Sequence, residues 1–311
     1  MIKLRRILPL IGILIFIYVI YHVGINKIIA TLPGINWWYV LASIALSFIV
    51  VLLQAQKWNS ILYHQGIELP FSTILHIHLI SLFYGNITPG KIGSFSKIFH
   101  LQEHTKRDIG GCISSVTLER FLDLLMVATF ALIGSIIALN YFTGIFVEFL
   151  ILFLILLTVL LLSLNEKTRE WFVWKVYKFL IPKKFKDRTL SSFNAFKETL
   201  LAPKQIIMPV ILTIMVWAGI YTQTYLIAQA LHMNISFLPF IFVSSIATVV
   251  TLIPITVGGI GTSEAAITVL FTRVFQTTPE IALSMAIITR IIGLIVTIIG
   301  GILSMRDEKY F

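Results

Sequence analysis

Long apolar runs are the feature of this chain that most restricts its fold. Six of them have about the length that a helix needs to cross a bilayer: Ile7 to Val23, Trp37 to Gln54, Ile113 to Leu139, Ile145 to Leu164, Ile206 to Leu231 and Ile281 to Leu303. The chain is 58% hydrophobic and 12% charged, whereas soluble domains are roughly 45–50% apolar. The sequence therefore predicts an all-α, multi-pass integral membrane protein with six transmembrane helices.

Two further apolar stretches, Phe71 to Phe99 and Phe237 to Phe275, are each interrupted by proline and glycine. The first contains NITPGKIGSFSK, Asn86 to Lys97, and the second contains IPITVGGIGTSE, Ile253 to Glu264. Proline and glycine end or break helices. We therefore expect two helices that stop in the middle of an apolar segment.

The positions of Lys and Arg predict how these segments cross the membrane, because cytoplasmic loops carry an excess of positive charge. Lys3, Arg5 and Arg6 place the N-terminus in the cytoplasm. The later basic groups are Lys97, Lys106 and Arg107, and the segment 165–204 with ten Lys or Arg residues against four acids. All of them are cytoplasmic, as is the C-terminus, if each interrupted stretch is a re-entrant hairpin that enters and leaves at one face.

The order of segments then occurs twice with opposite orientation: two spans, a hairpin and one span. The sequence supports the same alignment, since ITxGxIGS at 87–94 matches ITxGxIGT at 255–262 with an offset of 168 residues. The predicted units are 1–140 and 141–311, the second including the cytoplasmic basic amphipathic segment 165–204. Inverted repeats with broken helices are a recurring plan of transporters. The alternative is that both glycine stretches are surface turns and the chain crosses the membrane eight times.

Several charged residues lie inside apolar segments. Glu119, Arg120 and Asp123 fall in the third span, Arg290 follows at an offset of 170 from Arg120 in the sixth, and Glu264 lies at the foot of the second hairpin. Each such charge costs about 2.5–3.5 kcal/mol at the bilayer centre. Asp123 can pair with Arg120 three residues before it, while Glu264 and Glu119 are candidate partners of Arg290. These residues are either static ion pairs or a site for lipid phosphate, to which arginine donates a planar fork.

The glycine stretches supply a second kind of candidate contact. Small residues expose backbone N–H groups, and a helix that starts after Gly93 or Gly261 directs its positive end at an anion. Lys91 adds a cation to the first copy. The candidate phosphate-binding residues are therefore Lys91, Arg120, Arg290, Gly90, Gly93, Gly258, Gly259 and Gly261, with Glu119, Asp123 and Glu264 as charge partners.

The sequence gives no indication of catalysis or of a cofactor. Its single cysteine, Cys112, excludes an internal disulfide and a cysteine metal cluster. A nucleophile elbow, a P-loop and a dinucleotide fingerprint are all missing. In so apolar a chain, the net charge of +10 indicates anionic lipid head groups as partners rather than nucleic acid.

Three motifs together carry a resemblance to a known family. TPGKIGSFSKIF, LERFLDLL and IPITVGGIGTSEAAI resemble the flippase-like membrane family that includes the transmembrane region of lysylphosphatidylglycerol synthase and an archaeal dolichol-linked glycosylation protein. The third motif is the most specific, with Pro254 and Glu264 in place beside its glycines. The first departs from the family pattern P-G-R-x-G-E, since Lys91 and Ser94 stand where arginine and glutamate are common, so a carboxylate role is not carried over to position 94.

The resemblance implies movement of charged lipids between leaflets of the cell membrane, such as an aminoacylated phospholipid or a polyprenyl-linked carrier. The chain has no room for the soluble aminoacyl-transferase domain that some relatives carry. Any synthesis of the lipid is then expected from a partner, a lipid-modifying synthase or a glycosyltransferase. Two other functions stay open: a membrane-embedded enzyme that acts on a lipid-linked substrate, and a non-transporting scaffold for such a partner. The sequence does not set the oligomeric state.

Overall fold

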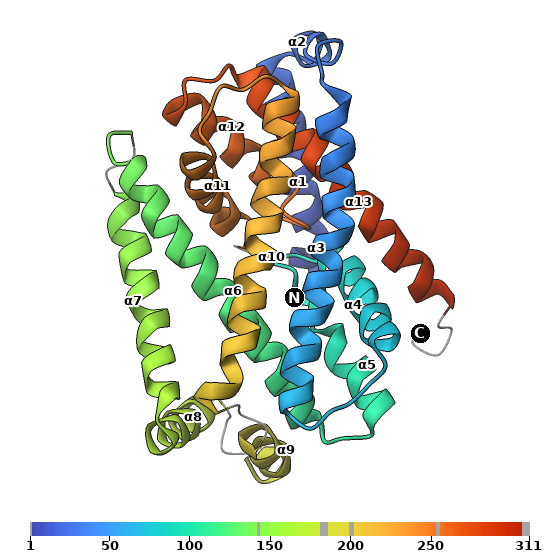
Figure 1. The fold of residues 1–311 in the computed structure, drawn as a ribbon, viewed down its shortest axis with the longest axis vertical. Helices are drawn as coiled ribbons and strands as arrows, with labels where there is room; N and C mark the ends of the chain where they lie inside the picture. Colours follow the sequence, from blue (N-terminus) through green and yellow to red (C-terminus); the bar gives the residue numbers. More distant parts are fainter. Residues whose placement is uncertain (1, 142–143, 181–185, 199–201, 253–255, 307–311) are drawn as a thin grey trace.

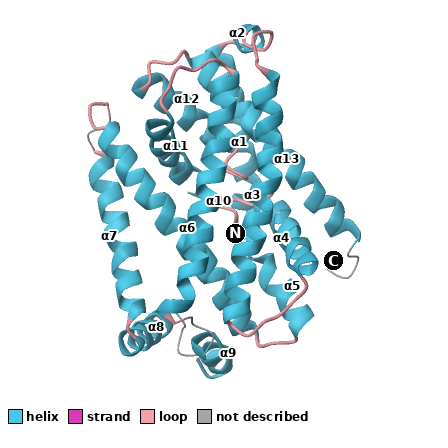
Figure 2. Cartoon of the chain, viewed as in Figure 1, coloured by secondary structure: helices cyan, strands magenta, loops and turns pink. Residues whose placement is uncertain are grey.

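In the part of the chain that the computed structural model describes, helices are joined by turns and loops, and no strand occurs there (Figure 2). The described residues are 2–141, 144–180, 186–198, 202–252 and 256–306. Pro254 and Ile255 of the second glycine motif, residues 181–185 of the basic segment and the C-terminal Lys309 lie outside them. The predicted all-α architecture is therefore confirmed.

Long helices match most of the predicted spans. They are α1 (Ile2–Val23), α3 (Trp37–His64), α6 (Ile109–Ile137), α7 (Ile145–Leu164), α10 (Pro203–Ala230) and α13 (Pro279–Arg306). Among the described residues, α3, α6, α7, α10 and α13 are long and apolar enough to cross a membrane, and the apolar part of α1, Gly12–Val23, is shorter. By length and composition, the described residues support five of the six predicted crossings.

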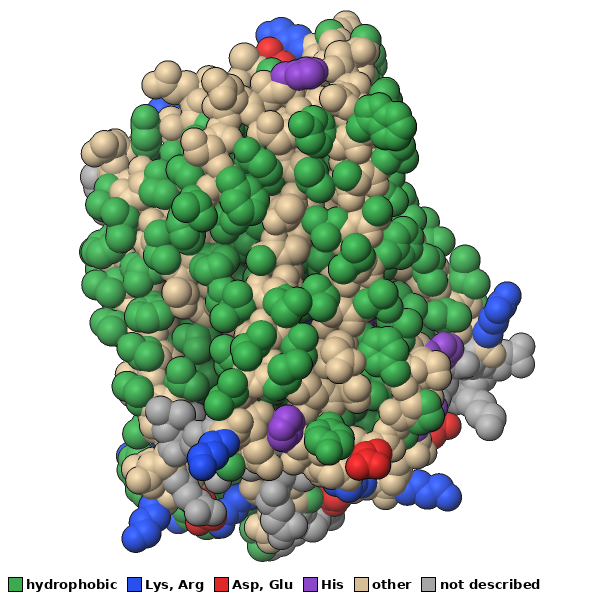
Figure 3. Space-filling view, in the orientation of Figure 1, with side chains coloured by type: hydrophobic (Ala, Val, Ile, Leu, Met, Phe, Trp, Pro, Cys, Tyr) green, Lys and Arg blue, Asp and Glu red, His purple; other side chains and the backbone are tan. Residues whose placement is uncertain are grey.

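The surface carries the apolar belt of a membrane protein. In Figure 3, hydrophobic side chains cover the middle of the visible face, and charged side chains gather at its two ends. Large apolar side chains such as Leu14, Trp38, Val147 and Ile298 are exposed. Exposed apolar area of this extent marks a surface that contacts lipid or another protein rather than water.

The first interrupted stretch folds back on itself. It contains α4 (Phe71–Asn86), the short 3₁₀ helix η1 (Ile92–Phe95) and α5 (Ser96–Thr105). The Arg107 guanidinium, just after α5, donates hydrogen bonds to the backbone carbonyls of Gln65 and Gly66, just before α4. Both ends of the stretch therefore lie at the same end of the molecule.

The second interrupted stretch has the same form. It contains α11 (Phe237–Leu252) and α12 (Thr262–Val274). The ring of Phe240, in the first turn of α11, lies 5.2 Å from the ring of Phe271, near the end of α12. This stretch too begins and ends in one place, in the half of the molecule opposite α4 and α5 (Figure 1).

Helix packing joins the two parts of the chain. α3 lies along α10, α6 packs against α11, and α13 packs against α4. The short helix α2 (Ile25–Ala30) lies at one end of the molecule, and α8 (Glu166–Leu180) and α9 (Lys186–Glu198) lie at the other (Figure 1). On α8, Lys175 and Lys178 lie over the rings of Trp171 and Trp174, a combination typical of helices at a lipid–water interface.

Candidate functional site

The two glycine stretches touch each other. Pro89 and Val257 form an isolated antiparallel bridge, and the N–H of Gly258 donates to the carbonyl oxygen of Thr88 at 3.5 Å. Gly258 has a φ of 57°, and a β-carbon at this position would overlap the carbonyl oxygen of Asn86. Only glycine allows this close contact without strain.

Arg290 fixes the tip of the second stretch to α13. Its guanidinium donates to a carboxylate oxygen of Glu264, to the Gly258 carbonyl at 3.2 Å and to the Gly259 carbonyl at 3.1 Å. The other oxygen of Glu264 accepts the Gly261 N–H at 2.7 Å. Of the two partners predicted for Arg290, Glu264 is the one that pairs with it.

The glycine N–H groups at both helix starts have partners within the chain. Glu264 takes the Gly261 N–H at the start of α12, and the hydroxyl of Thr88 accepts the Gly93 N–H at 2.6 Å. The sequence predicted that these two groups face an anion; in the structure the Gly261 N–H faces the Glu264 carboxylate and the Gly93 N–H faces a hydroxyl, and both bonds hold the tips in shape. Gly90 and Gly259 have positive φ angles of 59° and 71° and form the turns beside the bridge.

A buried network of charges lies beside the first tip. Lys97 donates to both oxygens of Glu119, at 3.0 and 2.8 Å, and Lys57 lies 2.7 Å from Asp123 and 3.8 Å from Glu119. The indole of Trp217 donates to Asp123 at 2.9 Å. The side chains of Lys57, Lys97 and Glu119 are at most 3% exposed. Both carboxylates are therefore neutralised by cations from other helices.

Arg120 and Lys91 differ from these buried groups. Arg120 lies 4.0 Å from Asp123, its side chain is 32% exposed, and its buried Nε has no hydrogen-bond partner. Lys91 is exposed and holds a left-handed backbone with a φ of 56°. It lies close enough to Arg120, Arg290 and Asp123 to interact electrostatically with all three. The structure thus gathers the predicted cations at the junction of the tips.

Lys57, Lys97 and Trp217 belong to this network but were not among the predicted site residues. Lys97 was assigned to a cytoplasmic basic cluster, yet its side chain is fully buried. Lys57 was placed beyond the end of a span, whereas α3 continues to His64. The sequence around Lys57 carried no signal of burial, since the polar residues Asn59 and Ser60 follow Trp58.

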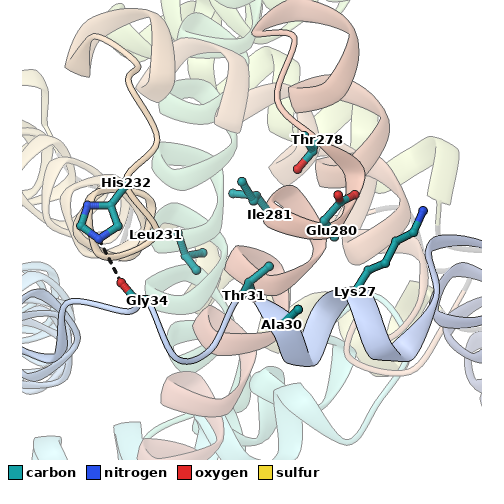
Figure 4. A pocket seen from close by; sticks show the side chains of 9 residues that line it. All are labelled: Lys27, Ala30, Thr31, Gly34, Leu231, His232, Thr278, Glu280 and Ile281. Carbon is teal, nitrogen blue, oxygen red and sulfur yellow. Dashed lines mark hydrogen bonds between the residues drawn. The ribbon is translucent and has the colours of Figure 1, made fainter.

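A separate pocket of about 450 Å³ lies at the end of the molecule that carries α2. Figure 4 shows Lys27, Thr278 and Glu280 around its opening, with His232 bound through its ring to the Gly34 carbonyl at 2.9 Å. Its walls come from the chain after α1, from the α10–α11 connection and from the start of α13. These three loops therefore lie at one end of the protein.

The fold and site define a multi-pass helical membrane protein with buried ion pairs and partly exposed cations where two broken helical stretches meet. The chain belongs to the family described as the lysylphosphatidylglycerol synthase TM region, whose model matches residues 7–301. This confirms the resemblance carried by the three motifs.

Archaeal proteins of the same kind match along most of their length. The chain is similar to a UPF0104 membrane protein of Pyrococcus horikoshii, with 25% identity over 98% of each chain. One of Methanocaldococcus jannaschii is also 25% identical, over 97% of this chain and 94% of the relative. One of Archaeoglobus fulgidus is 24% identical over 78% of each. The names of these relatives specify a membrane protein and no activity.

Proposed function

We propose that the protein moves a charged phospholipid or polyprenyl-linked lipid between the leaflets of the cell membrane. The observation that carries this proposal is the meeting of two helix breaks beside a set of buried charges, inside an apolar bundle. Ionisable residues in a membrane interior are expensive and mark pathways for polar groups. Irregular backbone at that depth is tolerated where it is buried in protein or lines a wet cavity.

The proposed architecture is an inverted repeat, with units 1–140 and 141–311, each containing a re-entrant hairpin. Support comes from the closed ends of both interrupted stretches and from the packing of α6 on α11 and of α13 on α4, which exchange under such a repeat. The bridge adds a sharper argument, because Pro89 and Val257 are 168 residues apart, the offset that aligns the two motifs. Equivalent residues contact each other where a twofold axis passes.

In this proposal the head group passes between the tips while the hydrocarbon chains stay in the bilayer. Arg290 fixes the position of the second tip, since its guanidinium binds Glu264 and two backbone carbonyl groups. When these hydrogen bonds break, that tip is free to move against α13. Rigid-body motion of one repeat against the other is how related architectures expose a central site to each side in turn.

The basic segment 165–204 and both termini face the cytoplasm in this orientation, and α2 with its pocket faces outward. Lys175 and Lys178 on α8 then meet the anionic lipids of the cytoplasmic leaflet. A lipid-modifying synthase or glycosyltransferase is proposed as the partner that supplies the lipid. Membrane lipids themselves are the partners that the transport step requires.

Leaflet exchange tests the proposal directly. Purified protein in liposomes is compared with Arg290→Ala for exchange of fluorescent lipids, and Arg273→Ala, an exposed arginine at the end of α12, serves as the control. We expect exchange with the wild type and the control, and its loss in Arg290→Ala at equal protein level. Absence of exchange for every lipid tested, with folded protein, overturns translocation; a change in lipid mass in the same samples points to an enzyme instead.

A further inference from the structure

We infer that the charged centre accepts a lipid head group of net negative charge, a phosphate without a compensating ammonium group, and rejects a cationic head group. The inference rests on the proposed function only in taking the ligand to be a lipid. Three observations support it: the numbers of cations and carboxylates at the two tips differ, their exposure differs, and the two copies of the motif give their arginines different partners.

The charges at the centre do not cancel. The cations are Lys57, Lys91, Lys97, Arg120 and Arg290, and the carboxylates are Glu119, Asp123 and Glu264. Five cations thus face three carboxylates, so the centre carries an excess of two positive charges, and Asp123 is shared between Lys57 at 2.7 Å and Arg120 at 4.0 Å. Charges in a low-dielectric interior need a partner, and an anionic ligand supplies it.

The two kinds of charge also differ in accessibility. The side chains of Arg120 and Arg290 are 32% and 23% exposed, and Lys91 is exposed as well. Glu264 is fully buried, Glu119 is 3% exposed and Asp123 is 15% exposed. A ligand that enters between the tips therefore meets more guanidinium and ammonium surface than carboxylate surface.

The arginines that belong to the two copies of the motif have different partners. Arg290 is neutralised by Glu264 of its own copy. At the repeat offset of 168, the residue equivalent to Glu264 is Ser96. The Ser96 hydroxyl is buried without a hydrogen-bond partner, as is Nε of Arg120. The first copy thus has the arginine but lacks the carboxylate at this position, and Arg120 keeps only its longer contact of 4.0 Å to Asp123.

A cationic head group finds few acceptors among these residues. Glu119 binds Lys97, and Glu264 binds Arg290 and the Gly261 N–H. One oxygen of Asp123 binds Lys57 and Trp217, and the other lies 4.0 Å from Arg120. An ammonium group at Asp123 would therefore lie against Arg120, and at Glu119 or Glu264 it would have to displace a buried cation, which is strongly unfavourable. A phosphate displaces nothing and gains charge-assisted hydrogen bonds from Arg120.

Native mass spectrometry of the full-length protein in detergent measures this selectivity without requiring transport. The probes have matched hydrocarbon chains where possible: phosphatidic acid, phosphatidylcholine and a cationic diacyl trimethylammonium-propane, together with a polyprenyl phosphate. We expect phosphatidic acid or the polyprenyl phosphate to bind roughly 10- to 100-fold more tightly than the cationic lipid, the range given by one hydrogen bond to a charged group. Which of the two phosphates binds better identifies the source of the phosphate.

Lys91→Asn removes one accessible cation and keeps a residue that tolerates the left-handed backbone. Lys106→Asn is the matched control, because Lys106 is also exposed, has a φ of 53° and follows α5 rather than the tip. We expect about a tenfold loss of phosphate affinity in Lys91→Asn, as one lost charge interaction predicts, no loss in Lys106→Asn, and recovery in Lys91→Arg. Arg120→Gln provides a second variant with the same expected loss.

The outcomes separate this inference from the proposed function. Equal or tighter binding of the cationic lipid, or unchanged phosphate affinity in both Lys91→Asn and Arg120→Gln, overturns the anionic selectivity, even if liposomes containing the protein exchange lipids. Selective phosphate binding that depends on these two residues establishes the site, even if no lipid exchanges. In that second case translocation fails while the inference stands.

Discussion

Pro89 pairs with Val257, the residue that holds its own position in the second copy of the motif. A contact between equivalent residues occurs where a twofold axis passes through a structure. The contact is made by backbone, in a place where glycines remove the side chains that would keep the tips apart. The two short sequences that match each other, although far apart in the chain, are therefore also in contact in space.

Gly258→Ala tests whether this junction matters. A β-carbon would overlap the Asn86 carbonyl oxygen and strain a backbone with a φ of 57°, so we expect a loss of about 1–3 kcal/mol, the range for a residue forced into a sparsely populated backbone region, and loss of leaflet exchange. The measurements are unfolding in mixed detergent micelles and exchange in liposomes. Gly293→Ala on α13 is the matched control, since a β-carbon there has no neighbour within 4 Å. A variant of Gly258 as stable and active as that control would contradict the prediction.

Glu119→Gln is expected to destabilise the protein more than Lys97→Met. Without the Glu119 carboxylate, the groups left to stabilise the charge of Lys97 among the described residues are the ring of Trp58, 4.6 Å away, and the neutral amide of the new glutamine; without Lys97, Glu119 still has Lys57 at 3.8 Å. Removing one partner of a buried pair costs about 3–5 kcal/mol, and we expect Glu119→Gln to reach this range and Lys97→Met to fall below it. Unfolding in mixed micelles compares the two. A double variant less destabilised than the sum of both confirms the coupling, and simple additivity argues against it.

Ser96→Glu should give the first tip the carboxylate that the second tip has. The new carboxylate stands at the position equivalent to Glu264 and should neutralise Arg120, so phosphate lipids are expected to bind about tenfold more weakly, as the loss of one charge interaction predicts. Binding measured by native mass spectrometry tests this. Ser96→Gln has the same size without the charge and is expected to lose much less. An equal loss in both variants would assign the effect to steric overlap instead.

Labelling from the two sides of the membrane tests the re-entrant topology. Cys112, the single cysteine, is buried and is replaced by alanine before Lys27→Cys or Lys106→Cys is introduced. We expect an impermeant maleimide to label these two positions from opposite sides, because two spans and a hairpin separate Lys106 from the N-terminus. Labelling from the same side would mean that the stretch between α3 and α6 crosses the membrane, as the alternative with eight spans requires.

The sequence predicted the helices well where one signal dominates. An apolar run whose single charge, Glu148, lies in its first turn gave the bounds of α7, Ile145–Leu164, as the structure has them. The end of α3 was placed ten residues too early, at Gln54 rather than His64. Lys57 lies three residues after Gln54. A lysine indicates the end of a transmembrane helix unless a carboxylate that pairs with it inside the protein is known. Its partner Asp123 is 66 residues away and is found only once the fold is known.

The need to know the fold also explains which residues of the site could be predicted from the sequence. Arg120 with Asp123 was predictable because the two residues are three apart on one helix. Arg290 with Glu264 was one of two open choices, and the structure selects it. Lys97 and Trp217 reach their carboxylates from other helices, and charge rules alone assigned Lys97 to the cytoplasm. The asymmetry between Ser96 and Glu264 follows from an alignment of the two copies, but its meaning depends on the unfilled hydrogen-bonding capacity of Arg120.

The bridge between the tips is also a weak contact. Among the described residues, the tips are joined there by one backbone hydrogen bond of 3.5 Å, from Gly258 to Thr88, and such a bond contributes at most about 1.5 kcal/mol. The helices on either side are held by their own hydrogen bonds and by apolar packing. Breaking this bond therefore costs far less free energy than unfolding either half.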